Sequence, residues 1–172
     1  MESRGFVHIY TGDGKGKSTA AFGLAVRALG HGRHVAIIQF LKKDKNYGEY
    51  KILSTLATML QFGTGSFVDM KNPSPQEISS AKSGLDKSRE IIFSGLYEIV
   101  ILDEITVAMN LNLISEEDVI GLMTDKPNDV ELILTGRGAT KKMIETADLV
   151  TEMKEVKHYF KKGVKAREGI EF

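Results

Sequence analysis

The sequence contains no cysteine and no tryptophan, and its formal net charge is zero. Without cysteine, the protein has no disulfides, cysteine-ligated zinc, iron–sulfur clusters or thiol catalysis. The balance of 23 basic against 23 acidic residues argues against broad, charge-driven binding of nucleic acid, although it is compatible with a local basic patch. No apolar run is long enough to span a bilayer, and the opening MESRGFVHIY lacks the layout of a signal peptide. We therefore expect a cytoplasmic protein that binds neither membrane nor nucleic acid.

The length and composition are those of an ordinary globular domain. The chain has 172 residues, of which 42% are hydrophobic and 27% are charged. No internal repeat, low-complexity tract or obvious linker divides it. We therefore expect residues 1–172 to form a single domain with one core.

Short apolar runs alternate with helix-like segments along the chain. Strands are expected at residues 6–10, 34–41, 97–104, 130–136 and 149–157, and helices at 17–30, 74–95, 115–123 and 140–148. Residues 42–51 are expected to be a polar loop, and residues 52–62 fit either a helix or a helix followed by a strand. Several strands are apolar on both faces. This pattern predicts an α/β fold with a mostly parallel sheet and helices on both faces.

The stretch YTGDGKGKST (Tyr10–Thr19) lies between the first strand and the first helix. It matches the phosphate-loop pattern G-x-x-x-x-G-K-[ST], except that Thr11 stands at the first glycine position. Glycines let backbone N–H groups point into one concavity, and a helix N-terminus favours an anion. A tight turn alone would need neither Lys17 nor Ser18. We therefore predict a nucleotide site formed by Thr11, Gly12, Asp13, Gly14, Lys15, Gly16, Lys17, Ser18 and Thr19.

Two acids and an arginine follow later strands. Asp103 and Glu104 end the run YEIVILDE, at the strand edge where ligands gather in open α/β sheets. They could hold Mg²⁺ together with Ser18, or act on a substrate; the alternative is that they cap the next turn. Arg137 in LTGRG could reach a phosphate from the same edge, or it could be a surface residue of a turn.

Five segments carry a resemblance to a known family. They are YTGDGKGKSTAAFGLAVRALGHG, IIQFLK, ILDEI, LTGRGA and the tail ADLVTEMKEVKHYFKKGVKAREGIEF, and they occur in this order from about Gly5 to Phe172. Together they resemble the CobA/CobO/BtuR-type ATP:corrinoid adenosyltransferases. The tail is the most specific, since few phosphate-loop proteins end in VKH-x-F-x-x-G-x-x-A-x-x-G-I-E.

The resemblance implies a RecA-like P-loop NTPase fold and an unusual reaction. In this family a cob(I)alamin-type Co(I) corrinoid attacks the 5′ carbon of ATP and releases triphosphate. Lys17 and Glu104 would then be the catalytic residues, and Ser18, Asp103 and Glu104 would hold Mg²⁺. The family also implies a homodimer and a reduced flavoprotein as electron donor. ATP is held in the reverse sense along the loop in family members, which fits Thr11 in place of glycine.

The corrinoid contacts are where the chain departs from the family pattern. Members often carry Phe and Trp in GTGF-x-W, and these aromatic residues displace the lower ligand of cobalt. This chain has GTGSFVDM, so Phe67 is the nearest aromatic residue and Val68 stands where Trp is frequent. Phe67 is the expected corrinoid contact. Two other functions stay open: a conventional P-loop ATPase or kinase, and a non-catalytic, ATP-gated corrinoid carrier.

Overall fold

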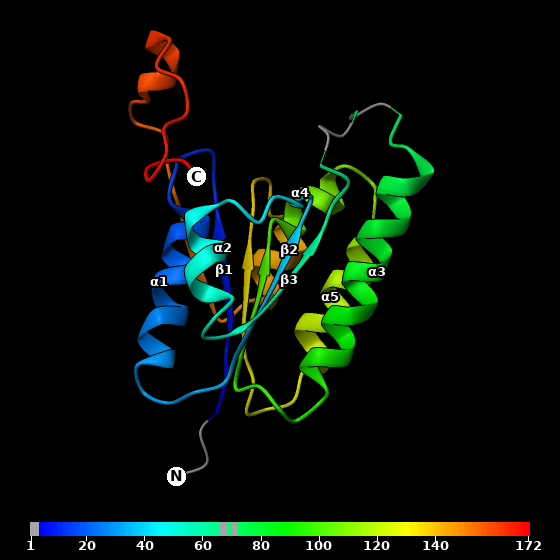
Figure 1. The fold of residues 1–172 in the computed structure, drawn as a ribbon. Helices are drawn as coiled ribbons and strands as arrows, with labels where there is room; N and C mark the ends of the chain where they lie inside the picture. The colour runs from blue at the N-terminus through cyan, green and yellow to red at the C-terminus, as the bar shows by residue number, and fades with distance from the viewer. Residues whose placement is uncertain (1–3, 66–68, 70–71) are drawn as a thin grey trace.

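The computed structural model describes residues 4–65, 69 and 72–172, and its centre is a parallel β-sheet (Figure 1). The strands are β1 (Val7–Thr11), β2 (Val35–Phe40), β3 (Thr58–Phe62), β4 (Ile99–Asp103), β5 (Glu131–Thr135) and β6 (Leu149–Glu152). Within the described residues they form one sheet in the order β3-β2-β4-β5-β1-β6, and every pair is parallel. The prediction of an α/β fold with a parallel sheet is confirmed.

Helices cover both faces of the sheet (Figure 1). They are α1 (Lys17–Leu29), α2 (Gly48–Leu53), α3 (Pro75–Ile92), α4 (Ile105–Asn110), α5 (Glu116–Asp125) and α6 (Lys141–Thr146). Side chains of β4 alternate between the faces: Ile101 packs with α1 and α2, whereas Val100 and Leu102 pack with the helices of the other face. The sheet is therefore buried on both sides, as its continuous apolar strands require.

Local signals in the sequence explain where the longer helices begin. Ser74 caps α3: its hydroxyl accepts from the Glu77 amide, and the Glu77 carboxylate accepts from the Ser74 amide at 2.7 Å. Ser115 caps α5 in a similar way by accepting from the Asp118 amide. By contrast, Gly16 precedes α1 and provides no side-chain cap. The first amides of α1 are therefore available to a ligand.

Three boundaries differ from those expected. α2 begins at Gly48, inside the segment predicted to be a loop, whereas its end at Leu53 and the strand β3 that follows agree with the helix-then-strand alternative for residues 52–62. α4 was not predicted, because its six residues follow the two acids at the end of β4 and no side-chain cap marks its start. β6 ends at Glu152, five residues before the expected end of the last strand. Short helices depend on tertiary packing more than on propensity, which explains the first two differences.

The chain after β6 returns to the edge of the sheet where the strands end. It contains one short 3₁₀-helix, η1 (Tyr159–Lys162), and its last residues lie beside the loop between β1 and α1 (Figure 1). Among the described residues, no helix is long and apolar enough to cross a membrane. The carboxyl ends of the strands and this C-terminal segment surround the predicted site.

Candidate functional site

The loop between β1 and α1 is held open by glycines and by the segment after β6. Gly12 and Gly16 have φ values of 95° and 122°, which side chains other than glycine rarely adopt. The Gly14 amide donates to the Met153 carbonyl at 2.7 Å. A Cβ on Gly14 would lie 2.7 Å from that same oxygen, so this contact requires glycine. The loop geometry therefore depends on a segment about 140 residues further along the chain.

Thr11 ends β1 at the position where the phosphate-loop pattern has glycine. It is buried, and its hydroxyl accepts from the Ala139 amide at 3.3 Å. The threonine thus connects the phosphate loop to the LTGRG loop that follows β5. This contact is a structural reason for threonine at this position, where the loop pattern has glycine.

Lys17 is buried at the start of α1 and points into the phosphate loop. Its Nζ donates to the carbonyl oxygens of Gly12 at 2.8 Å and Gly14 at 2.7 Å. Burial lowers the pKa of Lys17, and the nearby charge of Arg137 lowers it further. Both carbonyl partners belong to the loop itself. The ammonium therefore lies where it can move to an incoming phosphate.

Asp103 is fully buried at the end of β4 and is surrounded by donors. Its carboxylate accepts from Lys42 at 3.0 Å, from Gln39 at 3.0 Å and from Thr135 at 2.7 Å. Burial alone would raise its pKa, but the Lys42 charge and hydrogen bonds, including one from Ser18, outweigh burial and lower it. Asp103 thus stays ionised and links the first turn of α1 to the ends of β2 and β5.

Glu104 follows Asp103 in a left-handed backbone conformation with φ of 62°. Its amide donates to the Thr135 hydroxyl at 3.0 Å, which supports this conformation. Burial and the Asp103 charge raise the pKa of Glu104, although the charges of Lys42 and Lys17 oppose the rise. Among the described residues, no hydrogen bond reaches its carboxylate.

A cavity of about 690 Å³ lies against these groups. Its lining is partly polar, with Lys42, Glu104 and the first residues of α1, and partly apolar, with Phe22 and Leu53. The last four residues, Gly169–Phe172, form part of the wall. A smaller cavity of about 360 Å³ lies on the other side of the loop and is lined by Asp13, Gly14, Lys15, Lys17, Arg137, Glu155, His158, Phe160, Lys161 and Glu171.

The structure brings most of the predicted site residues together. Lys17, Ser18, Thr19 and Glu104 line the larger cavity, and Asp13, Gly14 and Arg137 line the smaller one. Lys15 lines both cavities, but its ammonium is bonded to the C-terminal segment. Phe67 lies outside the described residues. No group of three His, Cys, Asp or Glu side chains in the described part of the chain could hold a metal ion.

Three residues of the site had no predicted role: Gln39, Lys42 and Thr135. Each lies at or just after the carboxyl end of β2 or β5, the strands on either side of β4. Register could have indicated Gln39, because it pairs directly with Asp103. Strand order was needed to see this, and the sequence did not provide it.

A glycine-rich loop before a helix, a buried lysine in the loop and acids at the end of a second parallel strand of the same sheet define a P-loop nucleotide-binding protein. A KaiC-like protein from Pyrococcus horikoshii, PH0186, has a similar fold, with a TM-score of 0.58 at 17% identity over 87% of this chain and 73% of that one. This likeness confirms the RecA-like P-loop fold.

The sequence comparisons identify the family. The model for ATP:corrinoid adenosyltransferase BtuR/CobO/CobP matches residues 3–172, so the chain belongs to this family. It is 34% identical to the corrinoid adenosyltransferase of Escherichia coli K12, covering 100% of this chain and 88% of that protein. It is 36% identical to a corrinoid adenosyltransferase of a Sinorhizobium species, covering 99% of this chain and 82% of that protein. The resemblance found in the sequence is confirmed.

Proposed function

We propose that this chain transfers the 5′-deoxyadenosyl group of ATP to the Co(I) centre of a corrinoid, either cob(I)alamin or a precursor such as cob(I)yrinic acid a,c-diamide. The cobalt electron pair forms the new bond to the 5′ carbon. The bond from that carbon to oxygen breaks, and its electrons leave with inorganic triphosphate. The observation that carries the proposal is family membership over residues 3–172, together with a lysine-bearing phosphate loop. A conventional ATPase or kinase is not favoured.

The phosphate loop would stabilise the leaving triphosphate. Charge develops on the departing oxygen, so prearranged donors near it lower the barrier. Lys17 would supply an ammonium, and the uncapped start of α1 would supply amides. Arg137 lines the adjoining cavity, and we propose that it adds a second cation. A Co(I) nucleophile needs no general base, so Asp103 and Glu104 would position groups rather than move protons.

The site fits a Mg²⁺ ion that is bound mainly through ATP. The described residues hold no metal cage of their own, and Mg²⁺ usually takes only one or two protein ligands beside substrate phosphates. We propose the Ser18 hydroxyl and the Glu104 carboxylate as those ligands. Asp103 already accepts from Lys42 and Ser18, so it would act by positioning them. Bound Mg²⁺ would neutralise negative charge on the departing triphosphate.

The remaining parts of the proposal come from the family. Phe67 would contact the corrinoid and help to displace the lower ligand of cobalt. A reduced flavoprotein would supply the electron that produces Co(I). The chain would act as a homodimer in the cytoplasm.

An anaerobic assay with Mg-ATP and chemically reduced cobalamin tests the proposed reaction. We expect loss of the cob(I)alamin absorbance and formation of equal amounts of adenosylcobalamin and triphosphate. Release of ADP and phosphate without any change in the corrinoid would instead establish a conventional ATPase. Tight corrinoid binding without either product would establish a carrier.

A further inference from the structure

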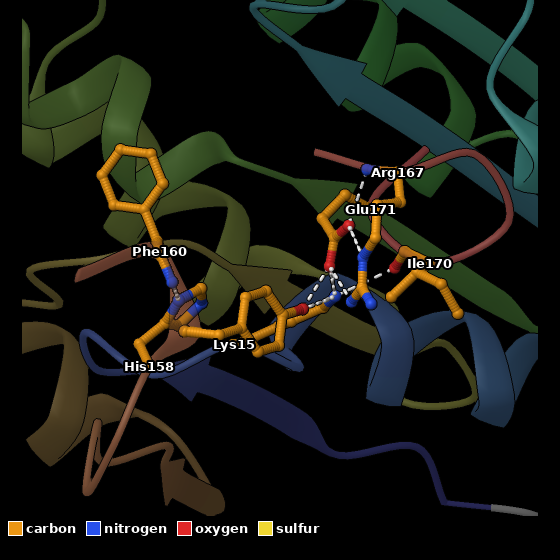
Figure 2. Close-up of polar contacts among 7 residues, drawn as sticks. Lys15, His158, Phe160, Arg167, Ile170 and Glu171 are labelled. Carbon is orange, nitrogen blue, oxygen red and sulfur yellow. Dashed lines mark hydrogen bonds and ion pairs between the residues drawn. The ribbon is translucent and has the colours of Figure 1, made fainter. Parts of the chain in front are cut away.

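Lys15 of the phosphate loop is bonded to the C-terminal end of the chain. Its ammonium donates to the Glu171 carboxylate at 2.7 Å, to the Ile170 carbonyl at 2.9 Å and to the Tyr159 hydroxyl at 3.1 Å (Figure 2). These contacts use all three donors of the ammonium group. In this arrangement Lys15 connects the loop to a segment about 150 residues away and has no donor left for a phosphate.

Glu171 is the centre of this contact. Besides Lys15, its carboxylate accepts from the Tyr159 hydroxyl, the Arg167 amide at 2.8 Å and the Arg167 guanidinium at 3.4 Å (Figure 2). Hydrogen bonds from Lys15 and Tyr159 hold the pKa of Glu171 well below its usual range. Two cations thus neutralise a single carboxylate. The carboxylate thus holds the last residues of the chain to Lys15, Tyr159 and Arg167 at the same time.

The segment that Glu171 holds, Gly169–Phe172, forms part of the wall of the larger cavity. The Phe172 ring packs edge-on against Tyr47, just before α2, with ring centroids 6.2 Å apart. The segment therefore reaches from the phosphate loop to α2. Ile170 is 56% exposed and Phe172 is 41% exposed, although both line the cavity. Apolar area at the mouth of the cavity is thus available for a ligand to cover.

We propose that residues Gly169–Phe172 form a C-terminal strap that completes the ATP pocket, and that Glu171 is a positioning residue which ties this strap to the phosphate loop through Lys15. The inference deepens the proposed function and rests on it. Lys15 then acts as the anchor of the strap, whereas Lys17 meets the phosphates. Loss of the contact between Glu171 and Lys15 would release the strap from one wall of the pocket. It should therefore weaken ATP binding more than it slows the chemical step.

Glu171 could have one of two opposite effects on ATP binding, and removal of its charge distinguishes them. If the carboxylate only competed with triphosphate for Lys15, its removal would tighten ATP binding. If it positions the strap, its removal weakens ATP binding. The direction of the change in KM therefore decides between the two.

The test compares Glu171→Gln with Glu168→Gln in the full chain. Both substitutions remove one negative charge from the same segment, but Glu168 is exposed and has no hydrogen bond or ion pair among the described residues. With Mg-ATP and reduced cobalamin, we expect Glu171→Gln to raise KM for ATP about five- to tenfold, as for the loss of one charged hydrogen-bond network. Its kcat should change less than about twofold, and Glu168→Gln should match the wild type. An unchanged or lower KM in Glu171→Gln overturns the proposal.

A double substitution separates the anchor from a direct phosphate contact. If Lys15 acts through Glu171, the effects of Lys15→Met and Glu171→Gln on KM are not independent, and the double variant is no worse than the poorer single variant. If the two increases in KM multiply in the double variant, Lys15 binds phosphate by itself, and its role as an anchor is overturned. Tyr159→Phe removes one hydroxyl from the same network and should raise KM in the same direction by a smaller factor. It keeps the proposal testable if Glu171→Gln fails to fold.

Calorimetric titration with Mg-ATP alone distinguishes failure of this inference from failure of the proposed function. Weaker ATP binding by Glu171→Gln than by Glu168→Gln supports the strap without any corrinoid present. Equal ATP binding by both variants, with a wild type that makes adenosylcobalamin, overturns the strap and leaves the proposed function standing. A wild-type chain that binds no Mg-ATP overturns both.

Discussion

At the scale of single residues, Lys17 carries the most direct prediction. Its ammonium contacts only the Gly12 and Gly14 carbonyls of its own loop, so Lys17→Ala leaves the core and the sheet intact. It would remove the cation that is proposed to stabilise the triphosphate. We expect a loss of about 10²- to 10³-fold in kcat/KM, as for other charge-stabilising donors, with an unchanged circular dichroism spectrum. Activity close to that of the wild type would remove Lys17 from the mechanism.

Glu104 is expected to lower the free energy of unfolding at neutral pH, although it serves the proposed function. Its pKa is raised by burial and by Asp103, so the folded chain binds this proton more tightly than the unfolded chain. The stability contribution of such a group is greatest below its unfolded pKa, and it falls as pH rises through the folded pKa. At pH 7 the ionised carboxylate therefore destabilises the fold, and Glu104→Gln should remove this cost.

Thermal unfolding and activity together check the Glu104 prediction. At pH 7, Glu104→Gln should have a higher midpoint of unfolding, by about 2–4 °C for each kcal/mol gained, and it should lose most of its activity at low Mg²⁺. The gain in stability should shrink as the pH is lowered towards the ordinary range of a glutamate. A variant that unfolds at a lower temperature than the wild type at pH 7 would contradict this account.

At the scale of elements, Asp103 connects four segments of the fold. Its carboxylate receives hydrogen bonds from α1, β2 and β5 and from Lys42 after β2. Asp103→Asn would remove the nearer carboxylate, at 3.0 Å, from the largely buried Lys42 ammonium, which also lies 3.8 Å from Glu49. Removal of one partner of a buried ion pair costs about 3–5 kcal/mol. We expect a loss of stability in this range at pH 7, measured by urea unfolding.

The pH dependence gives the Asp103 prediction a second readout. The folded-state pKa is depressed, so its stabilisation is fully present above the unfolded pKa of an aspartate and is lost as pH falls through the folded pKa. Acid unfolding of the wild type should therefore include this loss, and the difference between wild type and Asp103→Asn should narrow at low pH. A difference that stays constant down to acid pH would mean that the charge of Asp103 is not what stabilises the fold.

Elements with strong local signals could be predicted from the sequence, and those without them could not. The glycine loop before α1, the Ser74 cap of α3 and the apolar run of β4 all carry local information, and the structure confirms them. α2 and α4 have six residues each, and no strong local signal marks where they begin. Only their packing against the sheet makes them helical.

At the scale of the whole molecule, the sequence did not indicate which distant segments contact one another. The sequence indicated that Asp103 and Lys17 would lie at one edge of a parallel sheet, because both follow strands. It did not indicate that Lys42 would reach Asp103, since this depends on β2 lying beside β4. The contact between Lys15 and Glu171 spans 156 positions in the chain and follows from no local pattern. Strand order and the path of the tail had to come from the structure.

The single domain predicted for residues 1–172 can be tested through ATP. The candidate site draws on α1, the ends of β2, β4 and β5, and the C-terminal residues, so a ligand bound there contacts most of the fold. Mg-ATP at about 100 times its dissociation constant should stabilise a single cooperative unit by about 2.7 kcal/mol. Calorimetry should show one unfolding transition, which moves as a whole when ATP is added and does not move in Lys17→Ala. Two transitions, of which ATP moves only one, would contradict the prediction that the chain folds as one domain.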